Sequence, residues 1–578
     1  MKKAGRIILI VLAAVCLSAF GGGISKLIGG ISPGGGGVVI AGDATSEPFT
    51  KKINWEPSKL RIKYYDKSVD EQPYIPGWLT PDFGDVTWLT ISELSAMQLA
   101  KNSDATTPLY CKISTAQDLV DLGDYVTSYY RLNNVHFVQT ANIDLAGKPG
   151  FWMGADDSPF TGYYYGCGWK ILNYTFDPDP NATYNGLFGV LQNATISGVY
   201  LSHLRYEFPN VNCALGALAS YAVDSNISYC YIEDAVLTCS DERNAAASGS
   251  TIPAKTAALI GEASGATTVK YCRVLNSTLE CPAFVGYVGI SSAEGSGPSP
   301  AGDTDVTLYG CVNEAEITDA VYAAPFIGDI HDEVQGVYLT LCTNWGNVTA
   351  KAGNNAGGLI HRVGDYKKLV RVGACINYGD VSGKIAGGLA SHYSGQSLEV
   401  SNFVNYGKIT GGDAAGGVIG EMSLEGGTVN FECNVSAGNV AATSPSGTPG
   451  AFFGTFNIDA EGSGTLFSQD SDNRRLYNFA VPGTAFVGKL SYDGAAATDA
   501  QRRALEANHF FYHHLKVPAD PETLRTTGDD ADLLFYGFLN SNGTYGFCYS
   551  GERFYPGIQT DGRWEFVEHD VAVWGYEE

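Results

Sequence analysis

The chain has 578 residues, enough for several ordinary domains or for one elongated repeat domain with caps. It is rich in Gly (71), Tyr (34) and Phe (26), and only 17% of its residues are charged. Its 61 acidic and 36 basic residues give a formal net charge of -25, which argues against a nucleic-acid-binding surface because such a surface needs clustered Lys and Arg. We expect a β-rich protein with frequent tight turns and an acidic exterior.

The first residues have the pattern of a secretory signal. Basic residues precede an apolar run from Ile7 to Phe20, which is shorter than the roughly 20 residues of a membrane span. We predict export, with residues 1–21 as a cleaved signal peptide or, alternatively, as an uncleaved anchor. Residues 22–50 read as a Gly-rich linker. Any contact with a membrane is expected only through this N-terminal segment.

One short phrase, an apolar residue among small ones, recurs along the chain, as in "NGLFGVL" (185–191) and "GGLIHRV" (357–363). The anchoring apolar residues are Leu187, Leu218, Leu259, Phe284, Phe326, Leu359, Leu389, Val418 and Phe452. Their spacings of 25 to 42 residues are typical of a solenoid, a propeller or an array. No repeat can bury its own apolar face, so we predict an all-β fold, a parallel β-helix (β-solenoid) of about nine coils over residues 160–475. A propeller is the second choice, since its blades prefer uniform periods and four strands.

A second position, one per repeat, is occupied mainly by cysteine. It holds Cys230, Cys272, Cys311, Cys342, Cys375 and Cys433, with Val199 and Phe403 in other repeats. Exchange of Cys with Val and Phe indicates a buried apolar position. We favour a ladder of free thiols over a disulfide framework, because in-register side chains point alongside one another. Disulfides are the alternative, since exported proteins often use them.

A third position predicts a ladder of side-chain amides, which would bond from coil to coil at a corner of the solenoid. It consists of Asn313, Asn344, Asn377 and Asn405. In this interpretation the asparagines are structural and take no part in chemistry.

The repeats resemble those of GLUG-motif surface proteins of bacteria. The stretch "FTGYYYGCGWKILNYTF…NGLFGVLQNATISGVYL" (160–201) is similar to the opening of such repeats, although Cys167 replaces a usually polar residue. Upstream, "ISTAQDLVDLGDYVTSYY…VHFVQTANIDLAG" (113–147) resembles their helical entry and "IDL" strand. The resemblance covers roughly 113–456 and implies a β-solenoid that lies outside the cell or on the cell surface of a bacterium. Some immunoglobulin-A-cleaving metallopeptidases carry these repeats, but their zinc motif H-E-x-x-H is absent here, so the resemblance implies no protease activity.

The segment before the repeats, residues 51–159, reads as an N-terminal cap. Within it, "TAQDLVDLGDYVTSYYRL" (115–132) has apolar residues at helical spacing and Thr115 as a plausible N-cap. We expect this helix to cover the first open coil, because an exposed sheet edge needs protection.

Residues 476–578 read as a small, aromatic-rich C-terminal cap. A helix is expected from a capping box of Thr498 and Gln501, followed by a hairpin that turns at Asn542 and Gly543. We expect its aromatic side chains to plug the last coil, with a sugar-stacking surface as the alternative. These side chains are Tyr536, Phe538, Tyr545, Phe547, Trp564 and Trp574.

No motif for catalysis, for phosphate binding or for a cofactor is present. His509 and His513, with His514 beside them, have the spacing of a zinc pair, but the flanking "FFY" favours ring packing. The stretch "DPDPN" (177–181) lacks the later ligands of a calcium loop and reads as a turn. We therefore predict no catalytic residue, no cofactor and no metal.

A polar stripe, one residue per repeat just past the anchors, is the candidate functional surface. It consists of Glu262, Tyr287, Asp329, Arg362, His392 and Glu421. Polysaccharide-cleaving β-helices use such stripes, with acids and a base over a sugar groove. Asp329 and Glu421 are three coils apart, about 14 Å at the spacing of strands, whereas a glycosidase pair needs roughly 5 to 9.5 Å. Solvated turn residues are the plain alternative.

Two functions follow from these observations. The first is a non-catalytic exported surface protein, adhesin-like or a scaffold, that presents an extended face to glycans, matrix proteins or other cells. The alternative is a secreted polysaccharide-processing lyase or hydrolase. A catalyst needs acids and bases that converge in one pocket, whereas these polar residues differ from repeat to repeat. We favour binding.

Overall fold

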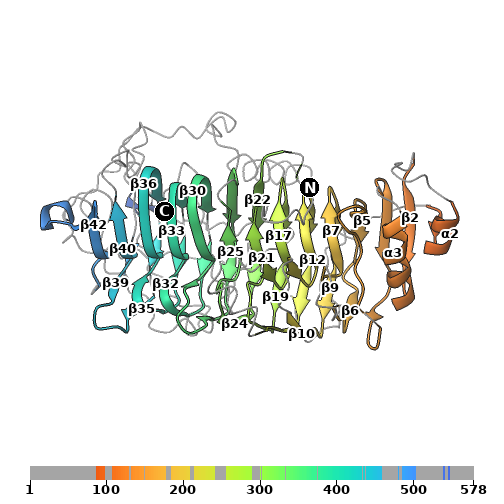
Figure 1. Cartoon of the computed structure of the whole chain (residues 1–578), viewed down its shortest axis with the longest axis horizontal. Coiled ribbons are helices and arrows are strands. Elements are labelled where there is room, and N and C mark those ends of the chain that lie inside the picture. The colour runs from red at the N-terminus through yellow and green to blue at the C-terminus, as the bar shows by residue number, and fades with distance from the viewer. Residues whose placement is uncertain are drawn as a thin grey trace.

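The computed structural model describes residues 86–97, 107–128, 132–148, 150–176, 184–208, 214–240, 255–289, 300, 302–331, 334–373, 375–401, 403–432, 434–436, 438–458, 479–480, 484–502, 538–539 and 545–546. Nearly all of these residues belong to an elongated stack of parallel β-coils (Figure 1). The predicted all-β parallel β-solenoid is therefore confirmed.

Each repeat passes through three long sheets, as one coil illustrates. Strand β30 (Ile360–Gly373) lies in sheet A, β31 (Ile376–Asn377) in sheet B and β32 (Val381–Gly387) in sheet C, after which the chain re-enters sheet A at β33 (Ala390–Ser401). In earlier coils the sheet A strand is divided in two, as in β25 (Ile327–Ile330) and β26 (Gly336–Thr340). Every contact between consecutive coils in these sheets is a parallel pairing.

The other strands of sheet A are β1 (Trp88–Leu89), β2 (Leu109–Ile113), β3 (Val135–Gln139), β5 (Tyr163–Tyr165), β7 (Phe188–Gln192), β8 (Thr195–Ser197), β12 (Ala219–Val223), β13 (Asn226–Ser228), β17 (Ile260–Ser264), β18 (Thr268–Lys270), β21 (Val285–Val288), β22 (Asp305–Tyr309), β36 (Ile419–Glu432), β40 (Phe453–Ile458), β42 (Val487–Tyr492) and the antiparallel β43 (Ala495–Ala496).

The other strands of sheet B are β4 (Ile143–Asp144), β6 (Lys170–Leu172), β9 (Tyr200–Ser202), β14 (Tyr231–Glu233), β19 (Arg273–Leu275), β23 (Val312–Asn313), β27 (Thr343–Asn344), β34 (Val404–Asn405), β37 (Val435–Ser436) and β41 (Phe479–Ala480). Those of sheet C are β10 (Arg205–Phe208), β15 (Val236–Cys239), β20 (Thr278–Leu279), β24 (Glu316–Ala320), β28 (Val348–Ala350), β29 (Ala356–Gly357), β35 (Ile409–Gly416), β38 (Val440–Ala442) and β39 (Thr448–Gly450). Strands β11 (Leu215–Gly216) and β16 (Thr256–Ala257) form a separate short pair.

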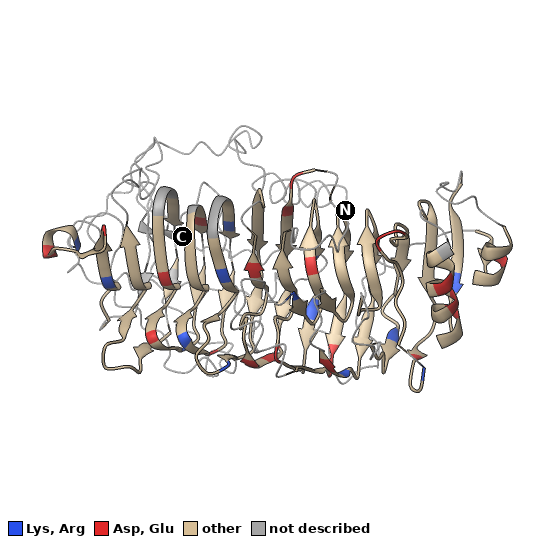
Figure 2. Cartoon of the chain, in the orientation of Figure 1, with Lys and Arg blue, Asp and Glu red and all other residues tan. Residues whose placement is uncertain are grey.

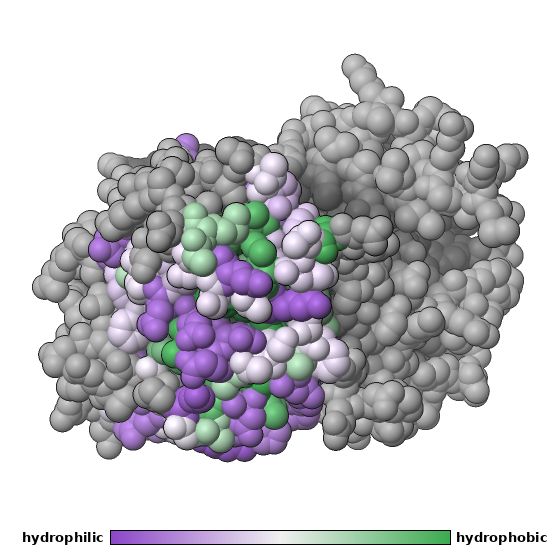
Figure 3. Space-filling view, turned by 90° about the vertical axis from the view of Figure 1, so that its right-hand side faces the viewer, coloured by the Kyte–Doolittle hydropathy of each residue, from purple (hydrophilic) through white to green (hydrophobic). Residues whose placement is uncertain are grey.

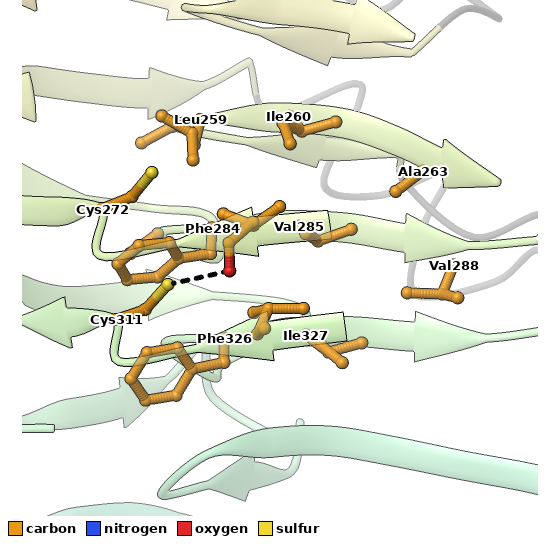
Figure 4. Close-up of a cluster of buried hydrophobic side chains, with 14 of the residues drawn as sticks. Leu259, Ile260, Ala263, Cys272, Phe284, Val285, Val288, Cys311, Phe326 and Ile327 are labelled. Atoms are coloured by element: carbon orange, nitrogen blue, oxygen red, sulfur yellow. Dashed lines mark hydrogen bonds between the residues drawn. The ribbon is translucent and has the colours of Figure 1, made fainter. Parts of the chain in front are cut away.

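The nine predicted anchors occupy equivalent places in the coils. Each directly precedes a strand of sheet A, and all nine are buried in one hydrophobic core. Consecutive anchors stack, as the rings of Phe284 and Phe326 do at 5.0 Å between centroids (Figure 4). Leu259, Leu359 and Leu389 belong to the same core, as the sequence predicts.

Sheet A extends beyond both ends of the predicted repeat region. At the C-terminal end, Phe486 precedes β42 and stacks on Phe452 at 4.2 Å, so "TAFVGKL" (484–490) acts as a further anchor phrase. At the N-terminal end, β1, β2 and β3 pair in parallel upstream of residue 160. This phrase has the same form as "PAFVGYV" (282–288), so the sequence carries the signal for it, but the predicted series of anchors ended at Phe452.

The N-terminal coils use helices where later coils use strands. Helix α2 (Ile91–Ala96) follows β1 and helix α3 (Ala116–Ser128) follows β2, and the two helices touch (Figure 1). The described residues contain no strand of sheet B or C before β4. Helix α3 therefore completes a coil rather than only lying over an open edge. The hydroxyl of Thr115 accepts from the backbone N–H of Asp118, which confirms the predicted N-cap.

Two predicted features of the C-terminal region lie within the described residues. The backbone N–H of Thr498 donates to Gln501 Oε1 at 2.9 Å and the N–H of Gln501 donates to Thr498 Oγ1 at 3.3 Å, which confirms the capping box. Strands β44 (Phe538–Leu539) and β45 (Tyr545–Gly546) pair antiparallel, as the predicted hairpin requires.

The cysteine column is buried and its thiols are free. Five cysteines each precede a strand of sheet B, face the core and form no disulfide: Cys230, Cys272, Cys311, Cys342 and Cys375. Figure 4 shows two of them, Cys272 and Cys311, beside the anchors. Each Sγ donates to the carbonyl oxygen two residues earlier, at 3.3 to 3.6 Å. Burial raises the pKa of the three thiols at 272, 311 and 375 well above the ordinary value.

The sixth cysteine of this column was assigned wrongly. Val404 pairs with Val435, so the residue that follows Phe403 in the column is Asn434, while Cys433 lies outside the described residues. The amide of Asn434 accepts from the backbone N–H of Phe403 at 2.9 Å and donates to Val400 O at 2.9 Å. A buried polar side chain is tolerated here because both ends of its amide are bonded.

We expect these five thiols to stay unmodified when the native protein meets a thiol reagent. They should react on unfolding without prior reduction, because they are buried and unpaired. Mass spectrometry of peptides after native and denatured labelling measures both states. Rapid labelling of the folded chain, or a need for reductant, would contradict the ladder.

The asparagine ladder is present as predicted. Asn313 Nδ2 donates to Asn344 Oδ1, Asn344 to Asn377 and Asn377 to Asn405, each at 2.8 Å. Each Nδ2 also donates to a backbone carbonyl two residues later, at 2.9 to 3.0 Å. All four side chains are fully buried, so the amides tie four consecutive coils together without exposing a polar group.

Replacing Asn344 with Ala should lower the free energy of unfolding by roughly 2 to 5 kcal/mol, because it leaves amide groups of Asn313 and Asn377 buried and unpaired. Urea unfolding followed by circular dichroism measures this loss. The control is Asn347→Ala, since Asn347 is exposed and accepts one bond, from the backbone N–H of Asp380. Equal losses for the two variants would show that the ladder adds no stability.

Candidate binding face

The six residues of the predicted polar stripe form one continuous row on sheet A. Backbone pairing places Glu262 beside Tyr287, Tyr287 beside Asp329, Arg362 beside His392 and His392 beside Glu421. Ile327 pairs with Ile360, which puts Asp329 next to Arg362 two residues later. With the neighbours that pairing adds, the row reads Val190, Tyr221, Glu262, Tyr287, Asp329, Arg362, His392, Glu421, Thr455 and Lys489.

Sequence reasoning missed part of this row, although the signal for it was available. Each member lies three residues after an anchor, and Tyr221, Thr455 and Lys489 obey the same rule. Tyr221 was passed over because the stripe was traced only from Glu262 onward. Lys489 was missed because its anchor, Phe486, was not recognised.

The row has a closed half and an open half. Tyr221, Glu262 and Tyr287 are at most 4% exposed. From Asp329 onward the side chains reach the surface, and Arg362 and Lys489 are exposed. The charged residues are spread singly over successive strands of sheet A rather than gathered in one cluster (Figure 2).

A buried ion pair closes the first half. Lys255 Nζ lies 2.9 Å from Glu262 Oε2, and both side chains are about as buried as the core, at 6% and 5% exposure. The same ammonium lies 5.9 Å from the centre of the Tyr287 ring. Glu262 and Tyr287 are therefore engaged within the protein, and a large ligand can reach only the later part of the row.

His361 is a buried neighbour of the open half that sequence reasoning did not single out. It precedes the exposed Arg362 on β30, and its ring packs edge-on against Tyr322 at 5.1 Å. Burial, with smaller contributions from the nearby Arg362 and His392, lowers the pKa of His361 to about 3, although a hydrogen bond with the backbone of Gly328 opposes the shift. The imidazole is thus neutral at ordinary pH and does not add to the charge of the row.

A second polar row lies on the later part of the strands of sheet A. Tyr338 pairs with Arg371, Arg371 with Glu399 and Glu399 with Asn430. The guanidinium Nε of Arg371 donates to Glu399 Oε2 at 2.6 Å. Register shifts in the pairing of β30, β33 and β36 separate this row from the first one along the strands.

The acids and bases of the row do not converge on one point. His392 Nδ1 is 4.0 Å from Glu421 Oε2, while Asp329 is three coils from Glu421, about 14 Å at the spacing of strands. The described residues contain no group of three or more His, Cys, Asp or Glu side chains placed to hold a metal ion. This arrangement suits contact with an extended ligand along several coils.

From the end that carries α2 and α3, hydrophilic and hydrophobic side chains are intermixed over the described surface (Figure 3). Among the described helices, none is long and apolar enough to span a membrane.

Several sequence predictions lie outside the described residues. They are the N-terminal signal and linker, the "DPDPN" turn at 177–181, the histidines His509, His513 and His514, and the aromatic residues Tyr536, Phe547, Trp564 and Trp574.

Comparison with known proteins adds one distant structural likeness. No protein-family model matches the chain, and no curated protein matches it either. The similarity to GLUG-motif proteins therefore stays a resemblance. A solved structure described as a "putative immunoglobulin A1 protease" from Bacteroides ovatus aligns with 51% of this chain and 74% of its own, at 11% identity and a TM-score of 0.31.

Stability should fall as the pH is lowered from about 6.5 toward 3, in part because of His361. Its folded pKa of about 3 lies below the unfolded value, so only the unfolded chain binds a proton in this range. One such group contributes about 1.4 kcal/mol per pH unit. In His361→Phe the free energy of unfolding should change less steeply with pH in this range, by up to that amount per pH unit. Above pH 7.5 the curves of the variant and of the unchanged protein should run parallel. Urea unfolding at several pH values measures both slopes, and identical slopes at acid pH would contradict the assignment.

Proposed function

We propose that this protein is a non-catalytic, exported surface protein whose solenoid presents the outer face of sheet A to an extended ligand. The observation that carries the proposal is the continuous row from Asp329 to Lys489, one side chain per coil on an unbroken parallel sheet. In repeat proteins such rows diversify while the core columns stay constant, which makes a broad recognition surface.

The chemistry of the open half fits a glycan or a protein surface on a matrix or another cell. Arg362 can donate two parallel hydrogen bonds to a carboxylate, and His392 one coil further and Thr455 three coils further add other polar groups. The secretory pattern at the N-terminus supports a location outside a bacterium or on its surface.

The alternative is a secreted polysaccharide lyase or hydrolase. It is supported by the occurrence of an acid, a base and a cation in one row. It is disfavoured by their separation, because Asp329 and Glu421 are too far apart for a glycosidase pair. The contact of His392 with Glu421 has no second carboxylate beside it in the row.

We expect the intact protein to retain members of a broad glycan array, and the double change Arg362→Ala with His392→Ala to weaken that binding about tenfold or more. Each change removes charge-assisted hydrogen bonds, and a tenfold loss corresponds to about 1.4 kcal/mol. The control is Lys408→Ala, which removes an exposed cation next to sheet C. Equal binding by all three proteins would exclude the open half of the row as the contact.

Incubation with acidic and neutral polysaccharides should release no oligosaccharide. Reducing-end and unsaturated-product assays measure hydrolysis and elimination, respectively. Turnover that disappears in Asp329→Asn or Glu421→Gln, with folding intact by circular dichroism, would overturn the binding proposal in favour of the enzyme.

A further inference from the structure

The open half of the row on sheet A has a charge pattern that complements its own reverse. Backbone pairing holds six side chains in register over six coils, a length of about 24 Å at the spacing of strands. Each of them is at least partly exposed. In chain order they are Asp329, Arg362, His392, Glu421, Thr455 and Lys489. A second row of the same residues, turned end to end, can therefore lie against the first with opposite charges facing each other.

Reversal sets charged residues of one copy opposite residues that they can bind on the other. At the two ends of the row, Asp329 of one copy lies opposite Lys489 of the second copy. At its centre His392 lies opposite Glu421 of the second copy, while its Nδ1 is already 4.0 Å from Glu421 Oε2 of its own chain. Each contact occurs twice, because a twofold axis relates the two copies. The surface is thus self-complementary, which is what a symmetric dimer requires.

Other ways of placing two copies face to face are less favourable. If the two rows run in the same direction and in register, every charge faces its own copy, and like charges that face each other disfavour binding. In the reversed arrangement, a shift by one coil in one direction sets Arg362 opposite Lys489 and Glu421 opposite its own copy. A shift in the other direction sets Lys489 opposite the buried Tyr287 in place of a carboxylate. Without a shift no like charges meet, and Arg362 lies opposite the hydroxyl of Thr455.

The local balance of charge also favours contact at this face. The chain carries a formal net charge of -25, so two copies repel each other overall. Within the row, however, the carboxylates of Asp329 and Glu421 are balanced by the cations of Arg362 and Lys489. Repulsion is therefore reduced where two such rows meet. The twofold axis runs along the strands, so the two copies of sheet A pack with their strands aligned, as the sheets of a sandwich do.

We propose that the partner of the open half of the row is a second copy of this chain, docked antiparallel on the same surface. The inference rests on the proposed function and names the partner of that face. The ends of the two solenoids that carry α2 then point in opposite directions (Figure 1). If the N-terminal segment is an anchor, which is one of its two predicted forms, the two copies belong to different cells. A contact limited to one row is small and weak for one pair of copies, but it becomes strong when many copies on two surfaces act together.

Reversal of charge at the two ends of the row tests this proposal. In Asp329→Lys the introduced ammonium faces Lys489 of a second copy, and in Lys489→Asp the introduced carboxylate faces Asp329. Sedimentation equilibrium of the full-length protein should show a dimer whose association constant falls roughly tenfold or more in either variant. An equal mixture of the two variants should recover most of the association, because each introduced charge then faces an opposite one. The controls are Asp413→Lys and Lys408→Asp, which make the same changes at exposed positions in and beside sheet C and should change nothing.

A variant that strengthens the contact covers the case in which Asp329→Lys does not fold. Thr455→Glu sets a carboxylate opposite Arg362 of the second copy and should raise the association constant severalfold. Sedimentation gives the mass of the product, which separates a dimer from an aggregate. The absence of a gain in this variant would contradict the proposed register.

Beads coated with the full-length protein give a second, multivalent readout, and they should cluster with the same dependence on the two charge-reversal variants. A protein that neither dimerises nor clusters beads would overturn the proposal, and so would a mixture of the two variants that fails to recover association. In either case, binding to the glycan array that is lost in the double change at Arg362 and His392 would leave the proposed function standing, with a glycan as the ligand. Absence of that binding as well would remove both.

Discussion

Main-chain hydrogen bonds between consecutive coils set the position of everything else in this protein. At each anchor the bond has the same form: Phe188 N–H donates to Leu218 O at 2.8 Å, and Ile260 N–H donates to Phe284 O at 2.8 Å. Parallel pairing in register fixes both the separation of the coils and the side of the sheet on which each residue appears. Repeats of different length keep this register because the differences in length fall between the strands.

As a result, equivalent residues of consecutive repeats become neighbours. This explains why the residues stacked in the interior are of the same type from coil to coil. An amide can bond to an identical amide one coil away, as Asn344 and Asn377 do. A thiol fits beside another thiol without pairing, because each Sγ finds a carbonyl oxygen in its own coil, as Cys311 does with Tyr309. On the outer surface no such partner is required, so the residues there can differ from coil to coil. The row on sheet A, for example, changes from an acidic to a basic residue between one coil and the next.

The sequence was sufficient for features that depend on a residue and its counterpart in the next repeat. Anchors such as Leu359, the amide ladder and the alignment of the polar stripe are all of this kind. It was insufficient for contacts made from outside the recurring phrase: Lys255 lies outside it, so its bond to Glu262 left no periodic signal. The assignment of Cys433 to the column in place of Asn434 was wrong for a similar reason. When the repeats differ in length, spacing alone cannot decide between two neighbouring residues.

The candidate face was predictable in position but not in accessibility. Counting three residues from each anchor finds the whole row, including Lys489, once Phe486 is accepted as an anchor. Which part of the row is open depends on contacts made by segments between strands, and on burial of groups such as His361, and neither follows from periodicity. The structure therefore restricts the candidate ligand-binding surface from the whole row to its C-terminal half.

The distance between spin labels at positions 236 and 408, introduced as unnatural amino acids, tests the stacked register most directly. Val236 and Lys408 are both exposed next to sheet C, and pairing through β20, β24, β28 and β32 places them five coils apart. Pulsed electron resonance should give a narrow distribution centred near 24 Å, allowing for the label arms, because each coil adds about 4.8 Å. A broad distribution, or a centre more than about two coils away from that value, would contradict the in-register solenoid and the row that depends on it.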